Sequence, residues 1–333
     1  MARTPVAQLR LNMTLKKQPF LLRDKIVTTT RVGNPMLRVT LADRTGTVAG
    51  VMFDVPAHVA DSLAVGSGVE VTGKVGEFRE QLQVSLERIV PADLPNLDEF
   101  LPTARRPIEE MQAELDARLA DITQPDLARL LASILGDEDT YQAYTHAPAA
   151  KVNHHACIGG LLEHTLAVAR IVLTACDLYP ELDHDLVLTV ALLHDLGKIR
   201  AYDPVSFQLT EEGILWTHLY MGASAVEHAI DALPGFSQEL RLRVVHAILS
   251  HHGRLEHGSP VVPSTLEAIV LHYADNLDGD ARGAIDQMAR MPVDGGAFTD
   301  RSMMHDTRIY RGSADWPEGS DANEGSAGQP SLW

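Results

Sequence analysis

The amino-acid sequence predicts an α+β multidomain protein with a small N-terminal β-barrel and a larger, all-α helical bundle. Short alternating segments separated by turns fill residues 19–90, whereas apolar residues recur at helical spacing from residue 107 onward. Residues 1–50 contain nine Lys and Arg against two Asp, although the 333-residue chain has a net charge of −17. Twelve of the fifteen histidines lie between His154 and His272. A basic front part joined to an acidic, histidine-rich body indicates two domains with different roles.

Composition narrows the class of protein. Apolar residues make up 45% of the chain, and no segment reaches the apolar length of a membrane span, so no membrane partner is expected. The two cysteines, Cys157 and Cys176, form neither a metal-binding motif nor a disulfide framework, which favours a cytoplasmic location. The acidic net charge argues against general attraction to nucleic acid. Contact with a polyanion is therefore expected only at the basic front part or where bound cations neutralise the acidic body.

The predicted barrel has three strands, a short helix and two further strands, which is the order of a five-stranded OB-type barrel. Such barrels commonly bind single-stranded nucleic acid through a basic groove and stacked aromatic side chains. Aromatic residues are sparse here, so a purely structural barrel is the alternative. The predicted strands are 20–31, 35–41, 47–53, 69–75 and 82–90, the helix is 56–63, and the aromatic residues are Phe20, Phe53 and Phe78.

These patterns divide the chain into five parts. Proline-bearing sequence follows the barrel, and Pro107 and Pro125 suit the first positions of two helices. The C-terminus is rich in Gly, Ser, Pro and acidic residues, as disordered segments are. The parts are a basic N-terminal segment (1–18), the barrel (19–95), a linker with connecting helices (96–150), the histidine-rich helical domain (151–310) and a disordered acidic tail (311–333).

The helical domain is organised around the run Leu192-Leu193-His194-Asp195-Leu196-Gly197-Lys198. A buried helix does not benefit from an adjacent histidine and carboxylate, because desolvating a carboxylate is costly unless a cation compensates it. A divalent metal compensates both side chains at once. Further histidines and carboxylates follow on separate predicted helices, and such groups converge on metal sites in helical bundles. They are His164, His218, His251, His252 and Asp275.

The order and context of His164, His194-Asp195 and Asp275 resemble those of the HD-domain metal-dependent phosphohydrolases. His218 and His251-His252 are similar to the subset with more than one metal. Together with the OB-like barrel, the segments His154-His155-Ala156-Cys157-Ile158-Gly159-Gly160, Ser250-His251-His252-Gly253 and Phe298-Thr299-Asp300-Arg301 extend the resemblance to the YhaM-type 3′-to-5′ exoribonucleases. It covers residues 20–310.

The resemblance implies a metal-dependent 3′–5′ exonuclease that hydrolyses single-stranded RNA, with single-stranded DNA as an open alternative, to nucleoside 5′-monophosphates by a metal-activated hydroxide. One metal would be held by His164, His194, Asp195 and Asp275. Asp195 would bridge to a second metal held by His218 and by either His251 or His252. Two Mn²⁺ ions per chain are expected, and Co²⁺, Fe²⁺ or Zn²⁺ would also suit these ligands.

Four further residues are expected to contact the substrate. Lys198 is placed to meet a phosphate oxygen, with capping of the preceding helix as the alternative. His154 and His155 are expected at the phosphate or, alternatively, at the entry of a helix. Arg38 is the barrel residue expected to bind the strand.

Two other functions remain open from the sequence. One is an HD phosphohydrolase acting on free or cyclic nucleotides, and the other is a nucleic-acid-binding protein with a structural HD domain. Whether the chain forms a homo-oligomer also remains open.

Overall fold

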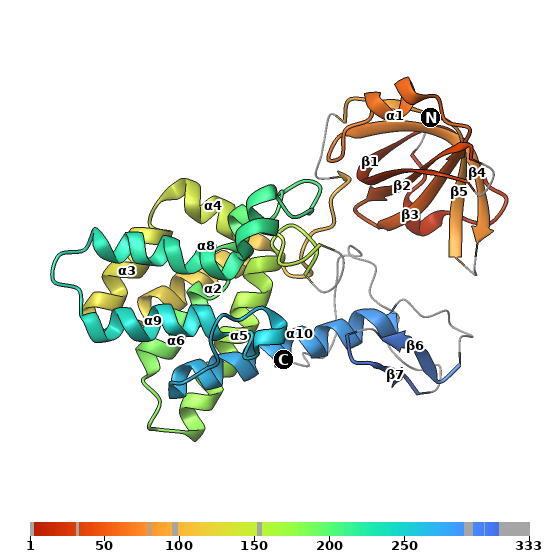
Figure 1. The fold of residues 1–333 in the computed structure, drawn as a ribbon. Coiled ribbons are helices and arrows are strands. Elements are labelled where there is room, and N and C mark those ends of the chain that lie inside the picture. Colours follow the sequence, from red (N-terminus) through yellow and green to blue (C-terminus); the bar gives the residue numbers. More distant parts are fainter. Residues whose placement is uncertain are drawn as a thin grey trace.

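The structure of the chain is a computed structural model that describes residues 3–30, 33–78, 81–94, 99–151, 155–289, 296–302 and 304–312. It contains a closed β-barrel, a helical domain and a two-stranded C-terminal hairpin (Figure 1). Within the described residues, no helix is both long and apolar enough to cross a membrane. His154 and residues 313–333 of the predicted tail lie outside the described residues.

The barrel has the predicted elements and closes in the order β1-β2-β3-β5-β4. All neighbouring strands are antiparallel except β3 and β5, which are parallel. This closed five-stranded topology confirms the predicted OB-like fold. The elements are η1 (Val6–Gln8), β1 (Thr14–Thr29), β2 (Pro35–Asp43), β3 (Gly46–Phe53), α1 (Ala57–Ser62), β4 (Gly68–Phe78) and β5 (Gln81–Pro91).

Strand β1 begins at Thr14, inside the segment that the sequence assigns to a basic N-terminal extension. Its pairing with β4 shifts register between Leu15 and Gln18, and Lys17 between them has a left-handed φ of 51°. This irregularity interrupts the alternation of apolar and polar residues, and so hides the start of the strand from a periodicity argument.

Side chains alternate across the barrel wall. Val39 on β2 is buried in the barrel core, whereas Arg38 and Thr40 belong to its outer face. Of the aromatic residues, Phe20 is fully buried, but Phe53 and Phe78 are more than half exposed. Two of the three aromatic side chains therefore lie at the barrel surface.

The helical domain contains nine described helices whose apolar faces meet in one core. Helices α2–α4, from the region expected to act as linker and connecting helices, contribute Met111, Leu115 and Leu130 to this same core. The helices are α2 (Ile108–Ala120), α3 (Pro125–Leu135), α4 (Glu138–His146), α5 (Gly160–Leu178), α6 (His184–Leu193), α7 (Lys198–Ala201), α8 (Glu211–Asp231), α9 (Gln238–Ser250) and α10 (Leu266–Ala289).

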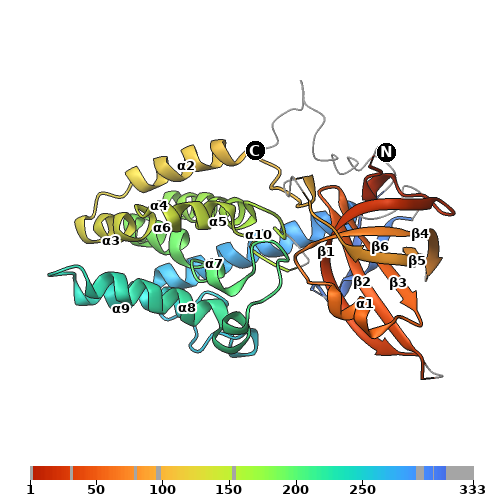
Figure 2. The ribbon, with the colours of Figure 1, turned by 90° about the horizontal axis from the view of Figure 1, so that it is seen from above.

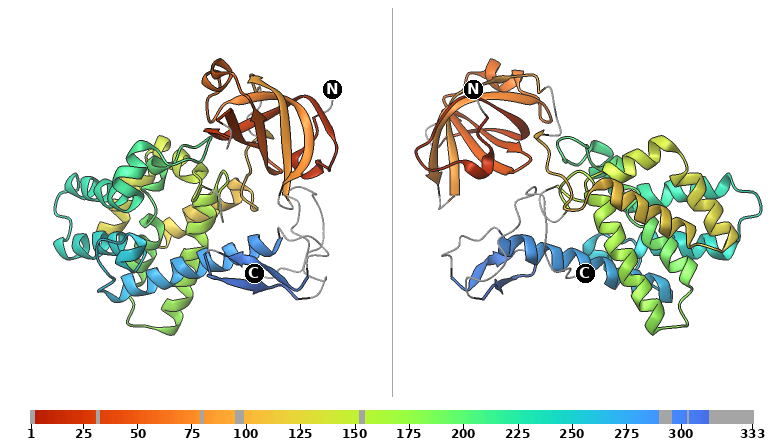
Figure 3. Two further views of the ribbon diagram at one scale, coloured as in Figure 1. Left: turned by 45° about the vertical axis from the view of Figure 1, so that its right-hand side comes forward. Right: turned by 180° about the vertical axis from the view of Figure 1, so that it is seen from behind.

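The barrel and the helical domain are joined by a small separate core. The barrel residues Leu21 and Ala42 pack with Phe207 of the helical domain, and Phe100 and Leu101 of the connecting segment complete this cluster. Figures 2 and 3 show the barrel beside the helical domain in views from above, the side and behind.

Arg23 crosses the same junction. Its Nε donates to the carbonyl of Ser206 at 3.0 Å, and its guanidinium lies 4.1 Å from the centre of the Phe207 ring. Burial lowers the pKa of Arg23 to about 10.

Helix α10 extends from the helical domain to the hairpin of β6 (Phe298–Ser302) and β7 (Thr307–Tyr310) (Figure 1). Gln287 of α10 donates to the carbonyl of Asp300, and Arg311 donates to that of Met288. The hairpin is thus fixed to the same helix that carries Asp275.

Candidate metal centre

The His-Asp pair lies at the C-terminal end of the most deeply buried helix. All residues of α6 from Leu186 to Leu193 are buried, and His194 forms the C-cap. A helix end leaves backbone carbonyls without helical partners. The Nδ1–H of His194 satisfies one of them by donating to Ala191 at 2.8 Å, which directs Nε2 away from the helix.

Helix α9 ends in the same way. His251 is its C-cap and donates from Nδ1 to the carbonyl of Ile248 at 2.7 Å. Its Nε2 is therefore directed into the protein, where the residue is almost completely buried. His252 is half-buried, and its Nδ1 donates instead to the carbonyl of His257 at 2.9 Å.

His164 of α5 lies between two carboxylates of α10. Its Nδ1 is 2.7 Å from Asp278 Oδ2, and its Nε2 is 3.1 Å from Asp275 Oδ1. Burial alone would lower the pKa of His164, but the hydrogen bonds to these carboxylates outweigh burial and raise it to about 9. The surroundings of this imidazole therefore favour a positive charge, which a proton or a metal ion supplies.

A first group of donor atoms surrounds His164 Nε2. It lies 3.3 Å from His194 Nε2 and 3.4 Å from Asp195 Oδ2, and His194 Nε2 is 3.4 Å from the same carboxylate oxygen. Ligand atoms about 2.1 Å from one ion lie about 3.0–3.4 Å from one another in octahedral or tetrahedral geometry. The spacing of His164, His194 and Asp195 fits one transition-metal ion. Asp275 Oδ1 lies beside this group, 3.1 Å from His164 Nε2 and 3.9 Å from His194 Nε2.

A second group surrounds the other oxygen of Asp195. Its Oδ1 is 3.4 Å from His218 Nε2 and 3.7 Å from His251 Nε2. These three buried atoms have no hydrogen-bond partner among the described residues. Burial lowers the pKa of His218 well below its ordinary value and that of His251 to about 3, so both imidazoles are neutral, as metal ligation requires. Orphaned, neutral donors around a carboxylate fit a second ion.

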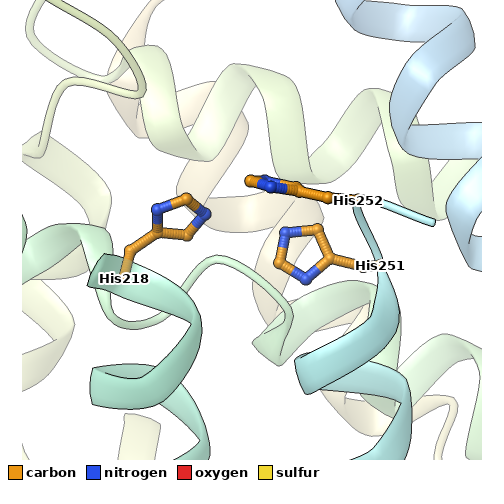
Figure 4. A group of neighbouring side chains, drawn as sticks. All are labelled: His218, His251 and His252. Atoms are coloured by element: carbon orange, nitrogen blue, oxygen red, sulfur yellow. The ribbon is translucent and has the colours of Figure 1, made fainter. Parts of the chain in front are cut away.

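Figure 4 shows the rings of His218 on α8 and of His251 and His252 at the end of α9 turned toward one another. The ring centres of His218 and His252 are 5.0 Å apart. His252 thus lies beside the second donor group, although its half-buried position and its bond to His257 distinguish it from the buried His251.

Lys198 contacts the same carboxylate of Asp195. Its Nζ is 2.7 Å from Asp195 Oδ2, so the side chain is directed to the donor cluster and not to the end of α6. Burial lowers the pKa of the ammonium, but Asp195 outweighs it and raises the pKa above its usual value. For Asp195 the sign is reversed. Burial would raise the pKa of this carboxyl, but the ammonium of Lys198 and the neighbouring His194 outweigh burial and hold the pKa well below its usual range. Both groups are charged at neutral pH.

Two local backbone features bring α8 to the His-Asp turn. A Cβ added to Gly197 would lie 2.1 Å from the carbonyl oxygen of His218, so only glycine allows this close approach. Thr217 has φ 62° inside α8, a strained conformation for a β-branched residue. The resulting kink comes immediately before His218, and such strain is often found at functional sites.

A cavity of about 240 Å³ opens on the donor cluster. His164, Lys198 and Asp275 line it together with His252 and His257. Farther along α10 it is lined by Asn276, Gly279 and Asp280, and Met304 lines it from the C-terminal hairpin.

A larger cleft of about 740 Å³ lies between the two domains. Thr40 and Thr47 line it from the barrel, and Arg105, Lys151 and Arg282 line it from the other side. Its lining also holds four carboxylates, those of Asp24, Asp43, Glu163 and Asp286, so the cleft carries charges of both signs. Arg38 is not among the residues that line this cleft, but it is exposed on the outer face of β2, two residues from Thr40.

His155 lines this cleft and lies between the carboxylates of Glu163 and Asp278. Its Nε2 is 3.0 Å from Asp278 Oδ2 and its Nδ1 is 3.1 Å from Glu163 Oε2. The structure therefore connects this residue, predicted to bind substrate, to His164 through Asp278.

Sequence reasoning assigned no role to Asp278, although it lies three residues after Asp275. This spacing puts both carboxylates on one face of α10. Carboxylates that hold the second nitrogen of a ligating histidine are a regular part of metal sites. The i, i+3 spacing was the signal available in the sequence.

Comparison with known proteins identifies both domains. Residues 161–280 match the HD domain, and residues 22–92 match an OB-fold nucleic acid binding domain. The 3′–5′ exoribonuclease YhaM of Bacillus subtilis is 33% identical over 84% of this chain and 88% of that protein. The YhaM exoribonuclease of Bacillus velezensis is 32% identical over 88% of this chain and 93% of that protein, and that of Geobacillus sp. is 33% identical over 84% and 86%.

Proposed function

Because this chain belongs to the family of the 3′–5′ exoribonuclease YhaM, we propose that it is a metal-dependent 3′–5′ exonuclease that removes nucleoside 5′-monophosphates from single-stranded RNA. The observation that carries the proposal is the convergence of two donor groups on the two oxygens of Asp195.

The two donor groups would hold two divalent ions. His164, His194, Asp195 and Asp275 are the proposed ligands of the first ion. Asp195, His218 and His251 are the proposed ligands of the second. His251 is preferred to His252 because its orphaned Nε2 is buried and faces Asp195. Imidazole and carboxylate donors suit Mn²⁺, the metal we propose, as well as Co²⁺, Fe²⁺ and Zn²⁺.

When bound, such ions supply Lewis acidity toward phosphoryl oxygens and make water nucleophilic at neutral pH. The chain itself orients the donors. Nδ1–H bonds fix His194 and His251, and Asp278 fixes His164. Lys198 is charged and lines the cavity, so we assign it to a non-bridging phosphate oxygen.

His252 and His257 line the same cavity and are candidates for contacts with the phosphate. The half-buried position of His252 leaves it accessible to a substrate in this cavity.

The cleft between the domains is the proposed route of the RNA strand. It is bordered by the outer face of the barrel and by Arg105, Lys151 and Arg282. Arg105 and Arg282 are paired with carboxylates of the same cleft, so Lys151 is the cation we assign to a phosphate there. Arg38 would meet the strand before it enters the cleft, and His155 lies where the cleft approaches the metal-site carboxylates. A cleft that extends from the barrel to the metal-site domain favours an exonuclease over an enzyme for free nucleotides, which has no use for so long an approach.

Labelled single strands test the proposal. With Mn²⁺, a 5′-labelled RNA strand should give a descending ladder, and a 3′-labelled strand should release labelled mononucleotide at once. Cleavage of a circular strand, or immediate release of the 5′ label as mononucleotide, would contradict a 3′–5′ exonuclease. A parallel panel with single-stranded DNA and with free and cyclic nucleotides measures substrate preference.

Elemental analysis of the full chain should find close to two bound transition-metal ions. Sedimentation of the same sample measures whether the chain forms a homo-oligomer.

A further inference from the structure

The cavity at the metal centre has two chemically different ends. Of the residues that line it, Lys198 and His252 lie beside the donor atoms and are suited to phosphate. The other end includes the apolar side chain of Met304, which comes from the C-terminal hairpin. Neither the matched HD-domain range nor the matched OB-fold range reaches this hairpin.

The two ends are connected along one helix. Asp275, Gly279 and Asp280 of α10 all line the cavity, and five residues of α-helix span about 7.5 Å along the axis. A ribose bridges a distance of this order between its 5′-phosphate and its base. A nucleotide with its phosphate at the donor cluster would therefore direct its base toward the hairpin.

His305 holds Met304 in this position. Its Nε2–H donates to the carbonyl of Asp280 at 3.0 Å, so Nδ1 is the acceptor of the Ser302 hydroxyl at 2.9 Å. Ser302 is itself buried. The turn that carries Met304 is thus fixed to α10 at the level of Asp280, beside the cavity.

We propose that the C-terminal hairpin forms the binding site for the nucleobase of the 3′-terminal nucleotide, with Met304 as the side chain that contacts the base and His305 as the residue that positions it. A flexible thioether packs favourably against aromatic rings without reading their hydrogen-bonding edges. The contact with Met304 would therefore not distinguish one base from another. This proposal rests on the proposed exonuclease function.

The test is a double-mutant-type cycle in which one change is made in the protein and the other in the substrate. It measures kcat/KM for removal of the 3′-terminal residue from single-stranded RNA ending in adenosine or in an abasic ribose. The wild-type chain should lose about two- to tenfold on the abasic strand. Met304→Ala should lose the same factor on the normal strand and nothing further on the abasic strand, because residues in direct contact are not additive.

Three further variants complete the experiment. Met304→Leu keeps apolar volume and should retain most of the activity. His305→Ala should reproduce the base-dependent loss of Met304→Ala. Thr307→Ala, exposed on the same hairpin and absent from the cavity lining, should behave as wild type on both strands.

Equal losses of Met304→Ala on both strands, or no loss on either, would overturn the base site while leaving the exonuclease intact. Failure of the wild-type chain to shorten the adenosine-ended strand would overturn the exonuclease function itself.

Discussion

Asp195 is the residue on which the proposed centre depends, because one carboxylate faces both donor groups. We expect Asp195→Asn to lower kcat by about 10³-fold or more, since metal ions contribute several kcal/mol to stabilising the transition state. His218→Ala removes a ligand of one ion only and should be less severe. Oligonucleotide kinetics and metal content measure both effects, with circular dichroism to check the fold.

Asp231→Asn is the matched control, because this carboxylate is exposed and paired with Arg241 at the end of α8. Retained hydrolysis in Asp195→Asn would rule out the bridging role.

Asp278 is expected to orient the ligand His164 and not to bind metal itself. Its carboxylate contacts His164 Nδ1 and His155 Nε2, and these two nitrogens belong to neither of the two donor groups around Asp195. We expect Asp278→Asn to weaken metal binding about 10- to 100-fold, as losses of outer partners of ligating histidines do. Titration with Mn²⁺ should show activity recovering at high metal concentration. A variant that stays inactive at saturating Mn²⁺ would instead make Asp278 a ligand or a catalytic group.

At the scale of elements, close backbone packing brings the two proposed metal-binding segments, the His-Asp turn and α8, together. Gly197 approaches the backbone of α8 at His218 and Gly222, so Gly197→Ala would force the two elements apart. Overpacking of this kind costs about 1–3 kcal/mol, and the displacement of His218 should also reduce activity. Thermal unfolding and Mn²⁺ affinity measure the two effects.

Gly222 lies on the other side of this contact and provides the control. A Cβ added there would lie 3.2 Å from the backbone nitrogen of Gly197, so Gly222→Ala requires a much smaller adjustment. If both variants proved equally stable and equally active, close packing would not explain the glycine in this turn.

The sequence predicted elements wherever periodicity was unbroken. The apolar run of α6 and the alternation in β2 gave segments that the structure confirms. It could not decide between His251 and His252, because neighbouring residues are turned by about 100° around a helix and tertiary packing sets which one faces inward. It also could not reveal that α2–α4 share the core of the later helices, since an amphipathic pattern identifies an apolar face but not its partner.

At the scale of the whole molecule, the barrel and the helical domain are joined tightly enough to affect how the barrel can be tested. Removing residues 1–95 would expose Phe207, Phe100 and Leu101 and leave Ser206 without Arg23. A truncated chain would therefore combine loss of RNA binding with loss of stability. Single substitutions on the outer face of the barrel avoid this problem.

Arg38 is the residue best placed for such a test, because it is exposed on β2, two residues from the cleft-lining Thr40. We expect Arg38→Ala to raise KM several-fold for a long single strand while hydrolysis of a dinucleotide is unchanged, since a dinucleotide occupies only the cavity. Losing one phosphate contact should also reduce the slope of log affinity against log salt by about 1. Arg88→Ala is the matched control, because this exposed arginine lies on β5 opposite Thr72 of β4, and neither strand borders β2. If Arg88→Ala weakened binding of the long strand as much as Arg38→Ala, the RNA would approach over the whole barrel surface and the face of β2 would not define its path.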